Sequence, residues 1–358
     1  MNAQILQAVD QLQREKGINK EIVVDAIKSA VISALQKKFA DIEEMSISFD
    51  DEDGEIRVYA KKRVVKGLAK TINDIALQEA REHDPDLKIG DYIDIELAPD
   101  SVGRIAAQTA RQIIVQKIKE AEKDNIYKQY ASRMNDMIKG NIQKVQSDES
   151  VLVDLGNIEA IVTRKDQIPG ERFRTGNLLK GIISEVKRTS RGPLVYISRT
   201  SPEFLKRLFE QEIPEISDGI IRILSVSREP GSRSKIAVIS DNDKVDPVGA
   251  CVGVKGVRIQ QIVNELRGEK IDVIRYNDDI RQFITNALAP SEVVSIEVKR
   301  DDSDSVETEV VVPDHHLSLA IGKEGQNVRL AARLVGAKID ILSESQKKQR
   351  LEEILDRE

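Results

Sequence analysis

The sequence predicts a multidomain α+β chain with a helical, α/β N-terminal domain, a small antiparallel β-barrel and two copies of one α/β module. Three observations support this prediction. Two amphipathic helix patterns and a hairpin pattern occupy the first 65 residues. Five short strand patterns punctuated by glycines lie between residues 137 and 200. A Gly-x-x-Gly motif then occurs twice, at residues 253–256 and 322–325, within the same succession of helix and strand patterns.

The N-terminal domain is expected to span residues 1–132. Strand patterns at residues 45–49 and 56–65 flank an acidic turn at residues 50–54, which resembles a calcium-binding loop. An EF-hand register anchored on Gly54 would place Phe49 and Ala60 where Asp and Glu ligands are needed, so we expect a solvated hairpin turn. Before the hairpin, Asn19 is a suitable N-cap for a helix whose apolar stripe consists of Ile22, Val23, Ala26, Ile27, Ala30 and Val31.

A long helical pattern follows, from residue 102 to about residue 134. It contains no proline, and Gly103 is its one glycine near the start. We expect this segment to connect the N-terminal domain to the barrel as one rigid rod.

Residues 133–200 are expected to form the barrel, with strands at residues 138–145, 151–155, 159–163, 179–186 and 194–198. The sequence Val-Asp-Leu-Gly followed by Ile-Glu-Ala-Ile-Val, within residues 153–162, resembles the S1-type OB barrel, a module that binds single-stranded RNA. Phe173 and Tyr196 are the only aromatic residues that its face offers for stacking on bases. A barrel that mainly spaces its neighbours therefore remains the alternative.

The two copies of the repeated module are expected at residues 201–276 and 277–345, followed by a charged tail at residues 346–358. Each copy has a lead-in helix pattern, two strand patterns, a short helix, the Gly-x-x-Gly loop, a second helix and a closing strand that contains Lys-Ile-Asp. This order is typical of the type II, prokaryotic KH domain, so we expect two tandem KH domains.

The Gly-x-x-Gly loop favours a nucleic-acid ligand for a physical reason. Two positions without Cβ atoms let the backbone lie against a sugar-phosphate strand, and the next helix presents free N–H groups to phosphate. KH domains hold about four nucleotides of single strand in this way. Six Phe, six Tyr and no Trp leave few residues for stacking, which favours this backbone-clamping mode over an aromatic sheet surface.

The charge distribution favours a few placed contacts over indiscriminate binding to polyanions. The net charge is −6, and residues 131–200 carry 12 Lys and Arg against 8 Asp and Glu, whereas acidic residues outnumber basic ones on either side. The candidate cations around the first loop are Arg228, Arg233, Lys235, Lys255 and Arg258.

Other classes of protein find little support. No apolar run approaches the length of a membrane span and the start is not signal-like, so we expect a cytoplasmic protein. Nucleotide-binding loops are absent. His83, His315 and His316 have no Cys or His neighbour to complete a metal site, and Cys251 lies in an apolar stretch where a buried, unreactive thiol is expected. We therefore expect no catalytic residues, no cofactor and no metal.

The order of an N-terminal domain, an S1-type barrel and two KH domains resembles the NusA family of bacterial transcription termination and antitermination factors. The resemblance covers nearly the whole chain. Its most specific stretches are residues 90–92, 107–117, 230–238, 246–253, 320–322 and 325–330, such as Pro-Gly-Ser-Arg-Ser-Lys-Ile-Ala-Val at residues 230–238.

The resemblance implies a non-enzymatic elongation factor that binds core RNA polymerase through its N-terminal domain and nascent single-stranded RNA through the barrel and KH domains. It implies effects on pausing, intrinsic termination and antitermination, the last together with other Nus factors and a ribosomal protein; we expect a monomer. By match to the family's motifs, the RNA-binding residues are Arg233, Lys235, Gly253, Val254, Lys255, Gly256 and Arg258 in the first KH domain and Gly322, Lys323, Glu324, Gly325, Gln326, Asn327 and Arg329 in the second.

Two features depart from the family pattern. Glu324 stands where a small or uncharged residue is frequent, and a carboxylate beside a phosphate should weaken binding, so we expect Lys255→Asp to cost more RNA affinity than Lys323→Asp. The chain closes with a charged helical pattern at residues 344–358, so no contact to polymerase through acidic C-terminal repeats is expected. A general RNA chaperone or ribosome-associated RNA binder would use the same barrel and KH domains but would leave the N-terminal domain without a role.

Overall fold

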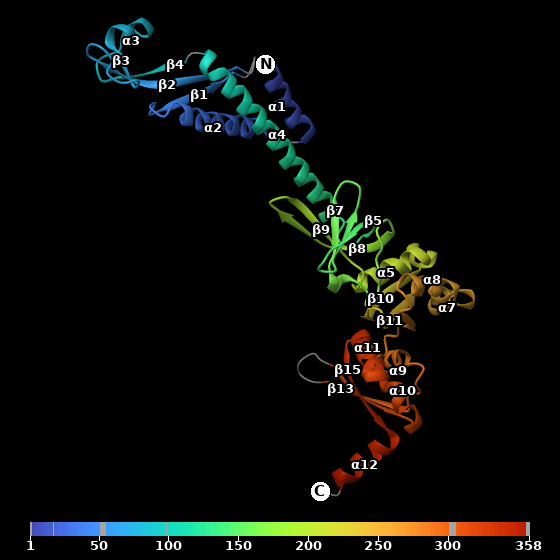
Figure 1. Cartoon of the computed structure of the whole chain (residues 1–358). Coiled ribbons are helices and arrows are strands. Elements are labelled where there is room, and N and C mark those ends of the chain that lie inside the picture. The colour runs from blue at the N-terminus through green and yellow to red at the C-terminus, as the bar shows by residue number, and fades with distance from the viewer. Residues whose placement is uncertain (1, 17, 51–54, 98, 301–305, 356–358) are drawn as a thin grey trace. The chain divides into compact units, whose positions relative to one another are not determined.

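The computed structural model describes residues 2–16, 18–50, 55–97, 99–300 and 306–355 (Figure 1). The chain divides into two compact units, Met1–Lys128 and Gln129–Glu358. The acidic turn predicted at residues 50–54 falls almost wholly on residues 51–54, which lie outside the described part. Over the described residues, no helix has both the length and the apolar composition that a membrane span requires.

One hydrophobic core joins the main helices and strands of the first unit. Its members come from α1 (Asn2–Lys16), α2 (Lys20–Lys38), β1 (Met45–Phe49), β2 (Ile56–Val65) and the first half of α4 (Pro99–Ala131). The predicted N-cap is confirmed, because the Asn19 side chain accepts a hydrogen bond from the Glu21 N–H at 2.9 Å. The stripe prediction was wrong at Ile22, which is 57% exposed. The buried residues of α2 are Val23, Val24, Ile27, Val31 and Leu35, a stripe that advances every four residues from Val23.

Residues 74–96 form three further elements. They are β3 (Asp74–Ala76), α3 (Leu77–His83) and β4 (Tyr92–Glu96). β3 pairs parallel and β4 antiparallel with the long strand β2, and Val64, Ile75 and Ala80 form a small separate core. Elements this short carry little periodicity of their own, so pairing with β2 decides them rather than local pattern.

Helix α4 is continuous from Pro99 to Ala131, which confirms the long helix predicted for this part of the chain. The five predicted barrel strands are also present. They are β5 (Met137–Val145), β6 (Val151–Asp154), β7 (Glu159–Val162), β8 (Leu178–Thr189) and β9 (Gly192–Ser198), closed in the order β5-β6-β7-β9-β8. Gly140 lets two strands approach closely, since a Cβ there would lie 2.6 Å from the Asp154 carbonyl oxygen.

Two modules with one order of elements follow the barrel. The first contains α5 (Pro202–Glu212), α6 (Pro214–Ser217), β10 (Ile221–Glu229), β11 (Arg233–Ser240), α7 (Pro247–Val252), α8 (Val257–Glu265) and β12 (Lys270–Arg275). The second contains α9 (Ile280–Leu288), β13 (Ser295–Arg300), β14 (Val306–Val312), α10 (Leu317–Ile321), α11 (Gln326–Val335) and β15 (Ala337–Ser343), and α12 (Glu344–Leu355) follows it. In each sheet the first strand is antiparallel and the last strand parallel to the middle one. This topology confirms the predicted pair of type II KH domains.

The second KH domain packs against the sheet of the first. Helix α11 contacts strands β10 and β11, and α9 contacts β12 (Figure 1). Ala237 and Ile274 of the first domain share a hydrophobic cluster with Phe283, Ile284 and Leu334 of the second. The sheet face that the first domain's own helices leave open is therefore covered by its neighbour.

Candidate nucleic-acid interface

The two Gly-x-x-Gly loops have the same backbone conformation. Gly253 and Gly322 have φ/ψ angles of 76°/173° and 74°/174°. At the third position of each loop, Lys255 and Glu324 are left-handed, with φ of 52° and 53°. The angles of Gly253 and Gly322 belong to a region that is open almost exclusively to glycine. The shape of both loops therefore depends on these two residues, whatever the charge of the side chains between the glycines.

The side chain five residues after each first glycine braces the loop against the preceding short helix. Arg258 donates to the Ala250 carbonyl at 2.8 Å and pairs with Glu215 at 3.0 Å. At the matching place in the second domain, Asn327 is 4% exposed and donates to the Ala320 carbonyl at 3.1 Å. The expectation that the Asn327 side chain faces phosphate is corrected by this burial. Both residues position the loop.

A helix begins directly after each loop, and no described side chain caps its first turn. The N-cap residues of α8 and α11 are Gly256 and Gly325, both left-handed, and neither helix start has a cap hydrogen bond from a described side chain. The first backbone N–H groups of an α-helix have no partner within the helix and lie at the positive end of its dipole. Some of these donors are used within the loop, since the Val257 and Gln326 N–H groups donate to the Val254 and Lys323 carbonyls. The positive end of each helix dipole still favours an anion such as a phosphate at this place.

The exposed side chains of the two loops differ in charge. Val254, which is 84% exposed, and Lys255 occupy the middle positions of the first loop. Lys323 and Glu324 occupy the same two positions in the second loop and are also exposed. The first loop thus carries one positive charge, whereas the charges of the second loop cancel. This difference supports the expectation that the first loop attracts RNA more strongly.

Gln326 and Arg329, which were expected at phosphate, connect the second KH domain to the first. The Arg329 guanidinium donates to both carboxylate oxygens of Glu229, at 2.7 and 3.1 Å. Gln326 donates to Glu229 at 2.8 Å and to the Ser232 hydroxyl at 2.7 Å. The Arg329 hydrogen bond is the main cause that lowers the pKa of Glu229. An RNA phosphate would have to compete with Glu229 for Arg329.

Three cations expected near the first loop form ion pairs with carboxylates of the protein. The Lys235 side chain is fully buried, and its ammonium pairs with Asp272 at 3.0 Å. Arg233 donates to the same carboxylate at 2.8 and 2.9 Å. Arg228 and Glu269 form a pair in which neither side chain has exposed surface. Lys235 and Arg228 therefore cannot contact RNA, which corrects the prediction for both, and Arg233 already has a partner.

Burial and neighbouring charges shift the pKa values of Lys235 and Asp272. Burial lowers the pKa of Lys235, although the neighbouring Asp272 opposes that change. Burial alone would raise the pKa of Asp272, but hydrogen bonds and charge from Arg233 and Lys235 outweigh burial, and the pKa lies below its usual range. Arg233 and Lys235 share the Asp272 carboxylate, so part of their positive charge is balanced inside the protein. The Asp and Glu residues that pair with the predicted cations were missed, because they lie far from them along the chain, as Glu269 does from Arg228 and Asp272 from Arg233.

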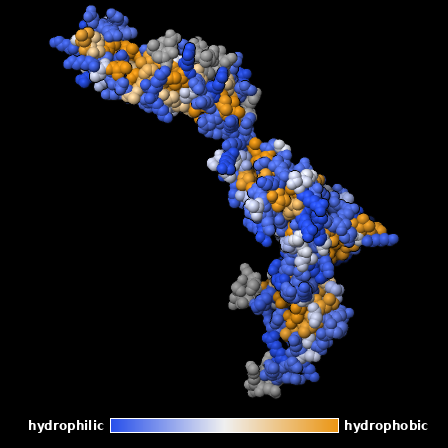
Figure 2. All heavy atoms as spheres, in the orientation of Figure 1, coloured by the Kyte–Doolittle hydropathy of each residue, from blue (hydrophilic) through white to orange (hydrophobic). Residues whose placement is uncertain are grey.

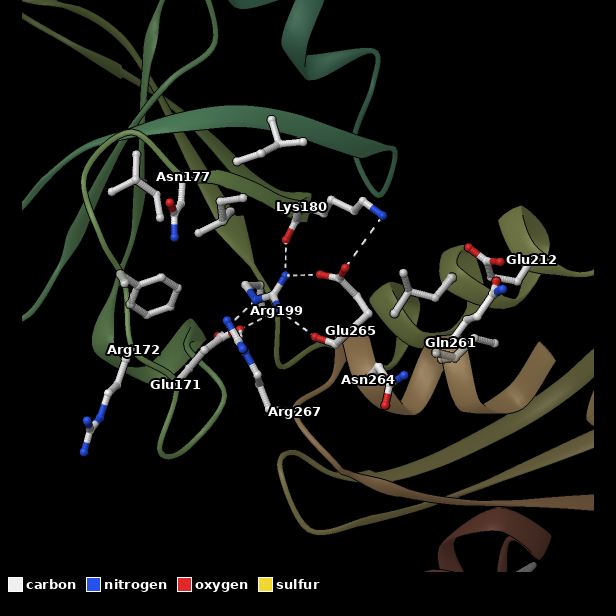
Figure 3. A pocket seen from close by; sticks show the side chains of 16 residues that line it. Glu171, Arg172, Asn177, Lys180, Arg199, Glu212, Gln261, Asn264, Glu265 and Arg267 are labelled. Carbon is white, nitrogen blue, oxygen red and sulfur yellow. Dashed lines mark hydrogen bonds and ion pairs between the residues drawn. The ribbon is translucent and has the colours of Figure 1, made fainter. Parts of the chain in front are cut away.

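The two aromatic residues singled out in the barrel lie at different places. Tyr196 lines a cavity together with Thr163 and Lys165, and the Lys187 ammonium lies 5.0 Å from its ring centroid. Phe173 lines a second cavity, between the barrel and the first KH domain (Figure 3). The two rings therefore do not form one stacking surface.

Two other side chains with reactive groups, His316 and Cys251, are hydrogen-bonded or buried. Among the described residues, no group of three or more His, Cys, Asp or Glu side chains is arranged to hold a metal ion. The His316 Nδ1 accepts the Glu292 N–H at 2.9 Å. Burial, with a smaller contribution from the Glu215 charge, raises the pKa of Cys251 to about 12, so the thiol stays protonated. Hydrophobic residues appear in Figure 2 as separate patches within a largely hydrophilic surface.

Family models match three segments of the chain. They describe the NusA N-terminal domain at residues 4–124, the NusA-like first KH domain at residues 199–276 and the NusA-like second KH domain at residues 280–349. The chain is also similar to relatives that carry the name transcription termination/antitermination protein NusA. The chain is 46% identical to that of Halalkalibacterium halodurans over 346 residues, which cover 97% of this chain and 90% of the relative. The chain is 45% identical to the protein of Bacillus subtilis, over 96% of this chain and 92% of the relative. It is 38% identical to the protein of Thermus thermophilus, over 94% of this chain and 89% of the relative.

Proposed function

Because the chain belongs to the NusA family of transcription termination/antitermination proteins, we propose that it is a transcription elongation factor. It binds RNA polymerase and nascent single-stranded RNA in the cytoplasm, and it modulates pausing, intrinsic termination and antitermination without catalysing a reaction. The observation that carries the RNA-binding part is the pair of loops with one conformation, each followed by an uncapped helix start.

The RNA contacts that we propose are made mostly by backbone. N–H groups at the starts of α8 and α11 donate hydrogen bonds to phosphate oxygens, and the glycines at both ends of each loop let the RNA strand approach the backbone. Lys255 and Lys323 are exposed and add charge. Arg258 and Asn327 hold the loops in shape for this contact.

Each domain has a proposed binding partner. Residues 1–132 bind core RNA polymerase, supported by the match of the N-terminal family model to residues 4–124. Residues 133–200, 201–276 and 277–345 form the barrel and the two KH domains that bind RNA, and residues 346–358 form the tail. A monomer of this kind joins other Nus factors and a ribosomal protein in antitermination complexes.

The test is the half-life of a hairpin-stabilised pause in transcription by bacterial RNA polymerase. The full chain is compared with a fragment of residues 129–358, which form a compact unit of their own. We expect the full chain to prolong the pause and the fragment to have no effect at the same concentration, because only the full chain contains the domain that binds polymerase. RNA binding by both proteins is measured in parallel as the control.

Absence of any effect of the full chain on the pause, together with normal RNA binding, would contradict the proposal. It would favour a general RNA binder instead. Prolongation by the fragment alone would show that the polymerase-binding role does not lie in residues 1–132.

A further inference from the structure

A cavity of about 490 Å³ lies between the barrel and the first KH domain (Figure 3). Its volume lies within the range of roughly 300 to 1,000 Å³ that small-molecule sites occupy. The barrel contributes the segment before β8 and the end of β9, and the KH domain contributes α5 and α8. Figure 3 shows Asn177 and Arg199 on the barrel side and Gln261 and Asn264 on the KH side.

The floor of this cavity is fixed by Arg199. Its guanidinium donates to both Glu171 carboxylate oxygens, at 2.5 and 3.0 Å, and to the Glu265 carboxylate and carbonyl, at 3.0 and 3.1 Å. It also donates to the Lys180 carbonyl, so all five of its N–H donors are used. Lys180 pairs with Glu265 at 3.6 Å. Arg267 lies 3.9 Å from Glu171 as well, so three cations, Lys180, Arg199 and Arg267, meet two carboxylates at the floor. The floor therefore does not repel an anion by net charge.

The rim carries groups of a different kind. Phe173 is half-buried and lines the cavity, and the exposed residues Asn177 and Gln261 line it from the barrel side and the KH side. Arg172 is exposed and has no partner among the described residues, and in Figure 3 its side chain points away from Arg199. A ring, amides that can meet a base edge and a free guanidinium are the groups by which proteins bind the unstacked bases and phosphates of single-stranded RNA.

Helix α8 links this cavity to the first loop. The loop ends at Gly256, where α8 begins, and Gln261, Asn264 and Glu265 at the far end of α8 line the cavity. A helix of nine residues is roughly 13 Å long. An RNA strand held by the first loop can therefore reach the cavity by following one helix.

We propose that this cavity binds one base of the single-stranded RNA held by the first KH loop. The base stacks on Phe173, and its edge forms hydrogen bonds with the amides of Asn177 and Gln261. Arg172 forms an ion pair with a neighbouring phosphate. This proposal rests on the RNA-binding part of the proposed function. It gives the barrel a defined place in RNA recognition, at its contact with the KH domain and not at the Tyr196 cavity.

The test measures binding of fluorescent RNA to the full chain and to its variants. Short oligonucleotides of about four nucleotides match one KH loop, and longer ones also reach the cavity. Phe173→Ala should weaken binding of the longer RNA roughly five- to tenfold, as expected for loss of one stacked base, and should leave binding of the short RNA unchanged. Phe173→Tyr keeps an aromatic ring and should retain the affinity of the original protein.

Gln261→Ala provides a second variant, on an exposed residue of the opposite wall whose replacement does not threaten the barrel. It should weaken binding of the longer RNA as well. Unchanged binding of the longer RNA by both alanine variants, with normal binding of the short RNA, would overturn the cavity proposal alone. Failure of the original protein to bind either RNA would overturn the proposed RNA binding itself. Binding of free AMP that depends on Phe173, without any effect on RNA, would assign the cavity to a mononucleotide and also overturn the proposal.

Discussion

At the scale of single residues, Glu324 is the side chain that most distinguishes the two loops. It occupies the left-handed third position that Lys255 occupies in the first loop, with φ angles of 53° and 52°. The backbone conformation is therefore the same in both loops, and we expect any difference in RNA binding between them to come from the charge of their side chains. A carboxylate at this position repels a phosphate held by the neighbouring N–H groups.

Glu324→Gln should strengthen binding of single-stranded RNA by about two- to threefold, because a charge pair several ångströms apart in water is worth about 0.6 kcal/mol. The gain should shrink at higher salt, which screens exposed charges. Fluorescence anisotropy with the full chain at two salt concentrations measures both. Glu307→Gln, on strand β14, is the matched control and should leave the affinity unchanged. An equal gain from both variants would show that only the net charge of the chain matters.

The candidate site shows where sequence reasoning ends at this scale. Motif and glycine pattern predicted both loops, and the structure has them where they were expected. The same reasoning could not tell a free cation from a paired one. Arg329 and its partner Glu229 lie 100 residues apart, and Lys235 is fully buried beside Asp272, 37 residues further along the chain. Pairing and burial of this kind depend on packing between domains, which no local pattern encodes.

At the scale of elements, each loop is a rigid joint between two short helices. Gly322 stands at the end of α10 with φ/ψ of 74°/174°, and a Cβ there would lie 2.8 Å from the Asn327 backbone nitrogen. That nitrogen belongs to the first turn of α11. The loop conformation is therefore coupled to the helix start that we propose as the phosphate site.

Gly322→Ala should destabilise the second loop by about 2 kcal/mol or more, because the side chain meets both backbone strain and a backbone clash. RNA affinity should fall, and amides at the start of α11 should exchange with solvent faster. Gly336→Ala is the control, since Gly336 has φ of 75° but a Cβ added there would meet no described atom within 4 Å. It should cost about 1 kcal/mol from the left-handed conformation alone and leave RNA affinity unchanged. Equal losses of affinity would show that the loop tolerates the clash.

The elements themselves were largely predictable where periodicity is strong. The barrel strands, the helix α4 and the helices and strands of both KH domains lie close to their predicted positions. The short strands β3 and β4 were missed, because strands of three to five residues give no reliable period and their pairing with β2 decides them.

At the scale of the whole molecule, the two KH domains are joined by polar contacts as well as by a hydrophobic cluster. The Glu229 carboxylate of the first domain accepts hydrogen bonds from Gln326 and Arg329 of α11, and the Arg333 guanidinium lies 3.7 Å from the same carboxylate. The Ser225 hydroxyl adds a hydrogen bond to the Leu334 carbonyl at 2.9 Å. These contacts hold the two loops in one relative placement, so an RNA strand that meets both finds a site prepared before binding.

Glu229→Gln should loosen this junction by about 1 kcal/mol at neutral pH, because it removes the charge from a partly exposed ion-pair network. Since the pKa of Glu229 is lowered in the folded chain, its carboxylate contributes stability above the ordinary glutamate value of about 4.3 and loses it as the pH falls through the lowered pKa. The difference between the original protein and the variant should therefore disappear in acid. Hydrogen exchange of the α11 amides in the full chain measures it, and exchange should be about fivefold faster in the variant at neutral pH, the rate ratio that 1 kcal/mol gives.

Asp241→Asn is the matched control for this junction. Asp241 also forms a bidentate pair, with Arg222 at 2.8 Å, but on the opposite end of strands β10 and β11 from Glu229. Its replacement should leave exchange in α11 unchanged at every pH. If Glu229→Gln speeds exchange equally at neutral and acidic pH, the carboxylate charge is not what holds the domains together, and the hydrophobic cluster around Ala237 and Phe283 carries the placement of the two loops alone.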